Sequence, residues 1–296
     1  MIDKTVSIIG VGNMGGGIAL NLLHRGYAVH VCDVEATRRQ FFIKKGAVAL
    51  VNTAQSATKS GVTIICLVDA AQIEDVLLGA DGLLKASPAD LQKQTVLLCP
   101  TISPQDAERF AKLLADHGVR MIEAPMSGGP LKAQDGSMSL MVACEDALFK
   151  QHESLLRDLS SQLFHVSQRI GDGARTKLVN NLLAAINLTG AAEAIAMAQR
   201  LGLDADRTLD VIEKSSGQSW IGSERMRRTL AGNVYPPGAH MTLLAKDTKL
   251  AMQAAFQTGC INPLGEVATG LFAHAIAQGM GDLDDSQMLK LFQDKN

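Results

Sequence analysis

A glycine-rich segment near the start of the chain has the residue types and spacing of a phosphate-binding loop. The strand-like run Thr5–Ile9 leads into Gly10-Val11-Gly12-Asn13-Met14-Gly15, and a helix-like run follows. In such a loop the first glycine permits a tight turn, the second lets a pyrophosphate approach the backbone, and the third allows helix and strand to pack closely. Free N–H groups at the helix start then hold the phosphates. We therefore predict dinucleotide binding rather than a plain turn, with contacts from Gly10, Gly12, Asn13, Met14 and Gly15.

An acidic residue after the second strand-like run bears on the choice of dinucleotide. Asp33 directly follows Ala28–Cys32, where a carboxylate accepts hydrogen bonds from the adenosine ribose hydroxyls. A 2′-phosphate there would meet a like charge, and Val34 offers it no donor. Arg38 and Arg39 oppose this reading, because either could reach a phosphate from the next helix. We predict NAD as the cofactor, with NADP less favoured.

Polar residues also share one face of a long predicted helix. Lys177, Asn180, Asn181 and Ala184 are spaced i, i+3, i+4 and i+7 within Ala174–Leu201. A lysine and two asparagines are unexpected on the face where a packing helix carries apolar residues, and they lie where the active site should be completed. From the spacing alone, a solvated face with a snorkelling lysine is an equal alternative.

The first half of the chain alternates short apolar runs with helical segments such as Ile73–Leu77 and Ala107–His117. This alternation predicts an α/β fold, a Rossmann-type doubly wound and largely parallel sheet with its ligand at the carboxyl ends of the strands. Strands are expected at Thr5–Ile9, Ala28–Cys32, Val62–Leu67, Val96–Cys99, Val119–Ile122, Met138–Val142 and Leu163–Val166.

The second half is rich in alanine and leucine with helical periodicity, which predicts an all-helical C-terminal domain. We expect a dinucleotide-binding domain over residues 1–167 and a helical domain for substrate binding and self-association over residues 168–296. The active site should lie between them, near the start of the long helix. Further helices are expected near Ala205–Ser215, Gly222–Leu230, Thr242–Thr258, Leu264–Gln278 and Ser286–Phe292.

Composition excludes several function classes. The 296 residues carry a net charge of −2, which gives no general attraction to nucleic acid or membrane surfaces. No uninterrupted apolar stretch is long enough to span a bilayer, so we expect a soluble, cytoplasmic protein. The five cysteines occur singly and the histidines lack ligand spacing, so we predict no metal site and structural thiols.

Four motifs resemble those of the β-hydroxyacid dehydrogenase family, which includes 3-hydroxyisobutyrate, tartronate semialdehyde and 6-phosphogluconate enzymes. The resemblance covers nearly the whole chain. The motifs are the glycine loop with Gly17-Ile18-Ala19, then Ala124-Pro125-Met126-Ser127-Gly128-Gly129, then Gly171-Asp172-Gly173-Ala174-Arg175-Thr176-Lys177-Leu178-Val179-Asn180-Asn181, and Lys246-Asp247.

The resemblance implies a hydride transfer between a nicotinamide cofactor and a small 3-hydroxy acid. Lys177 would be the general acid/base, which near neutral pH requires surroundings that lower a lysine pKa from about 10.4. Asn181 would orient the substrate, and Ser127, Gly128 and Gly129 would hold its carboxylate.

The remaining expected contacts lie on loops and in the helical half. Lys132 would contact an additional polar group of the substrate. The predicted cofactor contacts beyond the glycine loop and Asp33 are Leu67, Val68, Thr101 and Lys246. The family also implies a homodimer or homotetramer, assembled through the helical domain.

Departures from the family pattern narrow the substrate. Asn180 stands where the 6-phosphogluconate enzymes have a histidine, which argues against that substrate. Leu98-Cys99-Pro100-Thr101 replaces a common Asp-x-Ser-Thr, so that only the threonine of this loop is retained. Details of Thr101–Pro104, Pro130–Lys132 and Gly217–Trp220 resemble the L-threonate dehydrogenase branch. Tartronate semialdehyde reductase is the alternative within the family; imine reduction and a non-catalytic dinucleotide-binding protein are alternatives of other classes.

Overall fold

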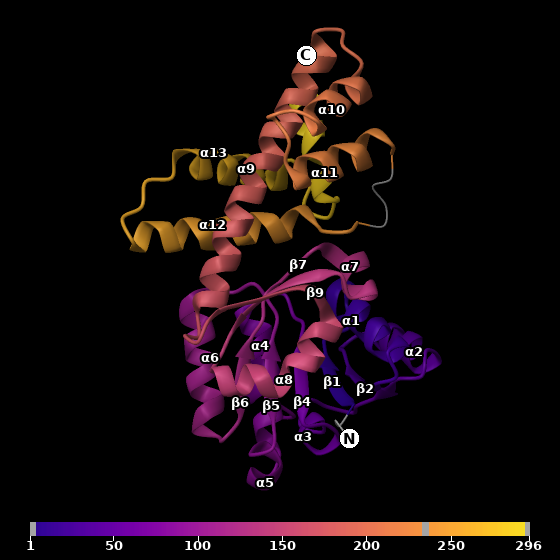
Figure 1. Cartoon of the computed structure of the whole chain (residues 1–296), viewed down its shortest axis with the longest axis vertical. Helices are drawn as coiled ribbons and strands as arrows, with labels where there is room; N and C mark the ends of the chain where they lie inside the picture. Colours follow the sequence, from indigo (N-terminus) through magenta and orange to yellow (C-terminus); the bar gives the residue numbers. More distant parts are fainter. Residues whose placement is uncertain (1–3, 233–236, 294–296) are drawn as a thin grey trace. The chain divides into compact units, whose positions relative to one another are not determined.

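The computed structural model describes residues 4–232 and 237–293, and the chain forms two units, Met1–Lys177 and Leu178–Asn296. The described part of the first unit contains a nine-stranded sheet in the order β3-β2-β1-β4-β5-β6-β8-β7, with β9 paired to β8 (Figure 1). Its strands are β1 (Thr5–Ile9), β2 (Ala28–Cys32), β3 (Val48–Ala49), β4 (Val62–Ile65), β5 (Thr95–Leu98), β6 (Arg120–Glu123), β7 (Met126–Ser127), β8 (Met138–Ala143) and β9 (Ser160–Ser167).

The sheet is parallel from β3 through β6. β8 runs antiparallel to β6 and β7, while β9 is parallel to β8. The predicted doubly wound, largely parallel sheet is therefore confirmed.

Neighbouring residues of the central strands enter different cores, because side chains alternate across a sheet. Ile8 and Leu97 belong to one apolar cluster, and Ile9 and Leu98 to another. Helices supply the other side of each cluster, as a doubly wound sheet requires. The helical elements of this unit are α1 (Asn13–His24), α2 (Ala36–Lys44), α3 (Ser56–Lys59), α4 (Ala70–Leu78), η1 (Leu83–Lys85), α5 (Pro88–Leu91), α6 (Pro104–Asp116), α7 (Gly129–Asp135) and α8 (Asp146–Leu159).

The described part of the second unit is helical, as predicted, around a core that includes Leu188, Met226, Met241 and Phe272. Several helix ends differ from the predicted ones by one or two residues: α9 and α11 begin two residues earlier and α10 ends two residues earlier. The final helix is a 3-10 turn followed by a short α-helix. The elements are α9 (Asp172–Arg200, which starts in the first unit), α10 (Ala205–Glu213), α11 (Trp220–Leu230), α12 (Met241–Gln257), α13 (Pro263–Ala277), η2 (Asp285–Leu289) and α14 (Lys290–Gln293).

Among the described helices, α9 alone is long and apolar enough to cross a membrane by length and composition. Core helices of soluble proteins pass the same test, and Ala185, Leu188, Ala192 and Ile195 of α9 are fully buried in the helical core. Packing in this unit thus accounts for one side of α9, while Val179, Leu183 and Met197 are exposed by 73%, 58% and 59%.

Candidate active site

The candidate cofactor residues of the first unit lie at one edge of the sheet. In a parallel sheet the carboxyl ends of the strands meet at the same edge, where open α/β folds bind ligands. The glycine loop follows β1, Asp33 follows β2, Leu67 and Val68 follow β4, and Thr101 follows β5. Ser127, a predicted substrate contact, is the last residue of β7, the short strand that follows β6 in the chain.

The backbone of the glycine loop leaves no room for side chains at two positions. Gly10 has a φ of +85°, and a Cβ there would lie 2.4 Å from the carbonyl oxygen of Cys66. A Cβ at Gly15 would lie 1.9 Å from the carbonyl oxygen of Gly10. At Gly12, by contrast, the nearest atom to a Cβ is Nη1 of Arg38 at 3.2 Å. The loop is therefore closed by backbone atoms at Gly10 and Gly15, whereas at Gly12 the nearest neighbour is the end of the flexible Arg38 side chain.

Asp33 ties this loop to the end of β2. Its Oδ2 accepts the N–H of Val11 at 2.8 Å and its Oδ1 accepts the N–H of Glu35 at 2.9 Å. The carboxylate is 5% exposed, and Nη1 of Arg38 lies 3.8 Å from it. Arg38 itself pairs with Glu35 at 2.8 Å, and Arg39 donates to the carbonyl oxygen of Asp33. Acceptors in the loop after β2 thus bind the side chains of both arginines, which belong to α2.

A pocket of about 370 Å³ opens between the glycine loop and α2. This volume is within the range of small-molecule sites. Its lining is mixed, as in a nucleotide site: two aromatic rings lie beside polar groups and the backbone of Gly12. Its wall consists of Val11, Gly12, Asn13, Thr37, Arg38, Phe41 and Phe42.

The predicted substrate loop is a glycine turn after β7. Gly128 and Gly129 have φ of +135° and +80°, a region that favours glycine. A Cβ at Gly128 would meet Cδ of Lys132 at 2.9 Å, whereas one at Gly129 would meet nothing within 4 Å. The structure thus brings Lys132 against Gly128 and leaves the backbone of Gly129 approachable.

Close packing joins the substrate loop to the cofactor loop. A Cβ at Gly17 of α1 would lie 2.8 Å from the carbonyl oxygen of Pro130 and 2.9 Å from Cβ of Ala133. α1 and α7 can therefore touch only because residue 17 is glycine.

In the helical unit, a polar chain runs from α9 to α12. Nδ2 of Asn180 donates to Oδ1 of Asn181 at 3.0 Å, and Nδ2 of Asn181 donates to Oδ2 of Asp247 at 2.6 Å. Oδ1 of Asp247 forms an ion pair with Nζ of Lys246 at 3.0 Å. Asn181 and Asp247 are both 8% exposed. The sequence analysis named Asp247 only as part of the Lys246-Asp247 motif and gave it no role. Its partner Asn181 lies 66 positions away in the sequence.

Lys177 ends the first unit, one helical turn before Asn181 on the continuous helix α9. It is 7% exposed, so the solvated, snorkelling alternative is wrong. Lysines are rarely buried without a partner or a function.

The two buried cysteines of the first unit, Cys99 and Cys144, are poor nucleophiles. A hydrogen bond with the Cys66 thiol and complete burial raise the pKa of Cys99 well above its usual range. Burial raises the pKa of Cys144 to about 12. Because the thiolate is the reactive form, both thiols are inert at neutral pH.

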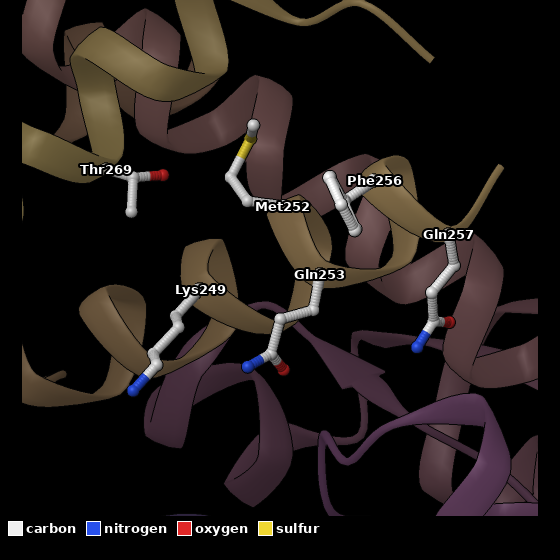
Figure 2. A pocket seen from close by; sticks show the side chains of 6 residues that line it. All are labelled: Lys249, Met252, Gln253, Phe256, Gln257 and Thr269. Atoms are coloured by element: carbon white, nitrogen blue, oxygen red, sulfur yellow. The ribbon is translucent and has the colours of Figure 1, made fainter. Parts of the chain in front are cut away.

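A larger pocket of about 620 Å³ lies in the helical unit and contains none of the predicted site residues. Figure 2 shows Met252, Gln253 and Phe256 of α12 with Thr269 of α13 across from them. Lys249 is its one ionisable lining residue in the described part of the chain. This pocket lacks an acid–base pair and a phosphate cradle, so its size does not make it the reaction centre.

Comparison with known proteins covers both units. The NAD binding domain of 6-phosphogluconate dehydrogenase matches residues 5–167, and the NAD-binding domain of NADP-dependent 3-hydroxyisobutyrate dehydrogenase matches residues 171–292. L-threonate dehydrogenase of Cupriavidus necator is 32% identical over 98% of this chain and 97% of its own. 3-Hydroxyisobutyrate dehydrogenase of Pseudomonas aeruginosa is 32% identical over 98% of this chain and 99% of its own. The crystal structure of 3-hydroxyisobutyrate dehydrogenase from Salmonella typhimurium superposes with a TM-score of 0.87, at 31% identity over 97% of this chain and 99% of that one.

Proposed function

The chain belongs to the β-hydroxyacid dehydrogenase family, and we propose that it transfers a hydride between NAD and a small L-threonate-like or 3-hydroxyisobutyrate-like acid. A nicotinamide-dependent hydroxyacid dehydrogenase is what the relatives of both units have in common. The finer proposal concerns the substrate, the cofactor preference and the residues that act.

A single observation carries the proposal: Lys177 is buried one helical turn from Asn181, whose amide is fixed by Asp247 at 2.6 Å. A lysine and an oriented amide on one helix face can handle a substrate hydroxyl. Lys177 Nζ takes the hydroxyl proton during oxidation and returns it during reduction. A protein that only sensed the dinucleotide would need the glycine loop but not this pair.

The cofactor residues fit a dinucleotide. The backbone of Gly12, which lines the pocket, would contact the pyrophosphate, and Asp33 would accept hydrogen bonds from the ribose hydroxyls. Thr101, Leu67 and Val68 follow neighbouring strands and would contact the remainder of the cofactor. When bound, NAD supplies the hydride acceptor of the oxidation.

Substrate selection is assigned to the end of β7 and the glycine turn after it. Ser127 would donate its hydroxyl, and Gly128 and Gly129 their N–H groups, to the substrate carboxylate; the backbone of Gly129 is the more approachable of the two. Lys132, packed on Gly128, would contact a second hydroxyl or carboxylate. Lys246, paired with Asp247, would contact the cofactor.

Self-association through the helical domain, residues 168–296, completes the proposal. Phe256, Ile261, Leu264 and Val267 are exposed by 87%, 89%, 67% and 63% along α12, α13 and their connection. Exposed apolar groups that gather in this way mark interaction surfaces. We place this dimer or tetramer in the cytoplasm.

A substrate panel tests the function. L-threonate, 3-hydroxyisobutyrate, L-serine, tartronate semialdehyde and their uncharged amides are assayed with NAD+ or NADP+ (or the reduced forms for the aldehyde) by the nicotinamide absorbance. We expect the highest kcat/KM with NAD+ and a 3-hydroxy acid, and loss of activity with the amide. Equal rates on an acid and its amide would contradict the carboxylate role. Cofactor binding without turnover on any of them would favour a non-catalytic protein.

A further inference from the structure

The start of α9 is held by one buried carboxylate from the sheet. Glu123 is the last residue of β6 and is 2% exposed. Its Oε2 accepts the N–H of Gly171 at 2.7 Å and of Gly173 at 3.2 Å. Its Oε1 accepts the N–H of Ala174 at 2.7 Å. A single side chain thus satisfies three backbone donors of the helix that carries Lys177.

Each backbone N–H group at the start of α9 has a hydrogen-bond acceptor. The first N–H groups of an α-helix have no partner inside the helix. Here the N–H of Asp172 bonds to the carbonyl of Arg169 at 3.2 Å, and Arg175 makes the first helical bond, to Gly171 at 2.9 Å. Every donor before that bond, other than Asp172, depends on Glu123.

Two glycines allow the helix to begin this close to the strand. A Cβ at Gly173 would lie 2.9 Å from both Cδ of Glu123 and the carbonyl oxygen of Met141, and Gly171 has a φ of +93°. The glycines of this motif therefore serve the contact with Glu123. Burial raises the pKa of Glu123, while the three N–H donors act in the opposite direction.

Ion pairs on the outer side of the same turn stabilise the start of α9 less than the hydrogen bonds to Glu123 do. Arg175 pairs with Glu108 of α6 at 2.7 Å and with Asp172 at 3.0 Å, and Asp172 also pairs with Arg169 at 2.8 Å. The Arg175 and Glu108 side chains are 39% and 46% exposed, and exposed ion pairs stabilise by about 0–1 kcal/mol. The buried carboxylate is the dominant attachment.

From this geometry, and resting on the proposed role of Lys177, we infer that Glu123 is a positioning residue that fixes the first turns of α9 and so the place of Lys177 Nζ. Lys177 follows Ala174 by three residues, which is less than one turn. A first turn that frays displaces the lysine directly. Misplacement of a reacting group by about 1 Å can cost 100-fold in rate.

The test compares Glu123→Gln and Glu123→Asp with Glu108→Gln, which loosens only the exposed pair. Gln keeps the shape but turns an NH₂ group toward the backbone donors; Asp keeps the charge but is one methylene shorter. The rate constant of the first turnover is measured by stopped flow with the best acid of the panel, because this constant does not depend on the fraction of folded enzyme. Amide hydrogen exchange of residues 173–178 is measured in parallel without substrate.

We expect the first-turnover rate constant to fall roughly tenfold to 100-fold in Glu123→Gln, with a smaller loss in Glu123→Asp. Amide exchange at the start of α9 should accelerate in both, NAD+ affinity should change less than twofold, and Glu108→Gln should match the wild type. A reduced burst amplitude with an unchanged rate constant would show a merely structural role and overturn the inference. Unchanged amide exchange would also overturn it. If Lys177→Ala kept full turnover, the proposed function would fail instead, whatever the exchange data showed.

Discussion

At the scale of single residues, the proposed reacting lysine and the asparagine one turn beyond it are both buried. Lys177 is 7% exposed, and Asn181, one turn further along α9, is fixed by Asp247 at 2.6 Å. A hydrogen bond from a neutral donor to a charged acceptor stabilises a protein by about 1.5–3 kcal/mol. The amide therefore has one preferred orientation before any substrate arrives, which is what a proton-transfer site requires.

Replacing Lys177 tests the acid–base role directly. Lys177→Ala should lower kcat by ~10²–10⁴-fold, the usual contribution of general acid–base catalysis, because no other group would take the hydroxyl proton. NAD+ affinity, measured by titration calorimetry, should remain nearly unchanged. Lys249→Ala, an exposed lysine of α12, is the matched control. A variant at position 177 that turned over at close to the wild-type rate would sink the assignment.

Asp247 provides a second test at this scale. Asp247→Asn removes the charge that accepts from Asn181 and pairs with Lys246 at 3.0 Å. We expect kcat/KM for the acid to fall by roughly tenfold or more, from the loss of a charged hydrogen bond. Asp116→Asn, at an exposed pair with Lys112, controls for the loss of a surface charge. Kinetics identical to the wild type would remove Asp247 from the site.

We expect Asp33 to set the cofactor preference. The carboxylate is 5% exposed and already ordered by the N–H groups of Val11 and Glu35, so it would meet a 2′-phosphate at short range. kcat/KM with one substrate should favour NAD+ at least tenfold over NADP+, and Asp33→Ala should reduce that ratio. Arg38→Ala, which removes the nearest cation, should not lower NAD+ preference. A wild-type preference for NADP+ would assign the phosphate to Arg38 or Arg39.

At the scale of elements, the sequence predicted those with a strong periodic signal. β1 and β2 coincide with their predicted bounds because their apolar runs end abruptly at Gly10 and Asp33. The two-residue strands β3 and β7 were missed, since two residues carry no periodicity.

Contacts that join distant parts of the chain could not be predicted from spacing. Glu123 reaches Gly171 across 48 positions, and Asn181 reaches Asp247 across 66. Motifs marked Gly171, Gly173 and Asp247 as noteworthy, but only the folded chain shows their partners.

Packing of α8 on β5 makes stability depend on pH. Nε2 of His152 lies 3.1 Å from Oγ1 of Thr95, and burial, with a smaller effect of Arg120, lowers the pKa of His152 to about 4. The unfolded chain, with a histidine pKa near 6.5, binds more protons between these values. The contribution of His152 to the free energy of unfolding is therefore fully present above pH 6.5 and is lost as pH falls toward 4.

Chemical denaturation at pH 7 and pH 4.5 measures this effect. The wild-type free energy of unfolding should fall by about 1–2 kcal/mol more than that of His152→Gln over this interval, since solvent at the partly exposed ring screens part of the effect. Gln keeps a polar group near Thr95 without titrating. Exposed His117→Gln should keep the wild-type pH dependence. Equal losses in all three proteins would show that His152 does not titrate as its burial requires.

At the scale of the whole molecule, the two units have separate cores. The sheet of the first unit has an apolar cluster on each face, and the helical unit has its own around Leu188 and Phe272. The change from β-branched runs to alanine- and leucine-rich helices predicted this division. Which apolar residues stay outside the helical core is seen only in the folded unit.

Those exposed residues lead to a prediction about assembly. Phe256 and Ile261 are 87% and 89% exposed at the end of α12 and just after it, so a second copy of the chain could bury both at a favourable ~25 cal/mol per Å². We expect the wild type to sediment as a dimer or tetramer and the Phe256→Asp/Ile261→Asp variant to sediment as a smaller species. Its far-ultraviolet circular dichroism should not change, because neither side chain belongs to the helical core. Val51→Asp, at an 85% exposed apolar residue of the first unit, is the matched control and should sediment as the wild type does. A monomeric wild type, or an assembly that survives both aspartates, would place the subunit contact elsewhere or remove it.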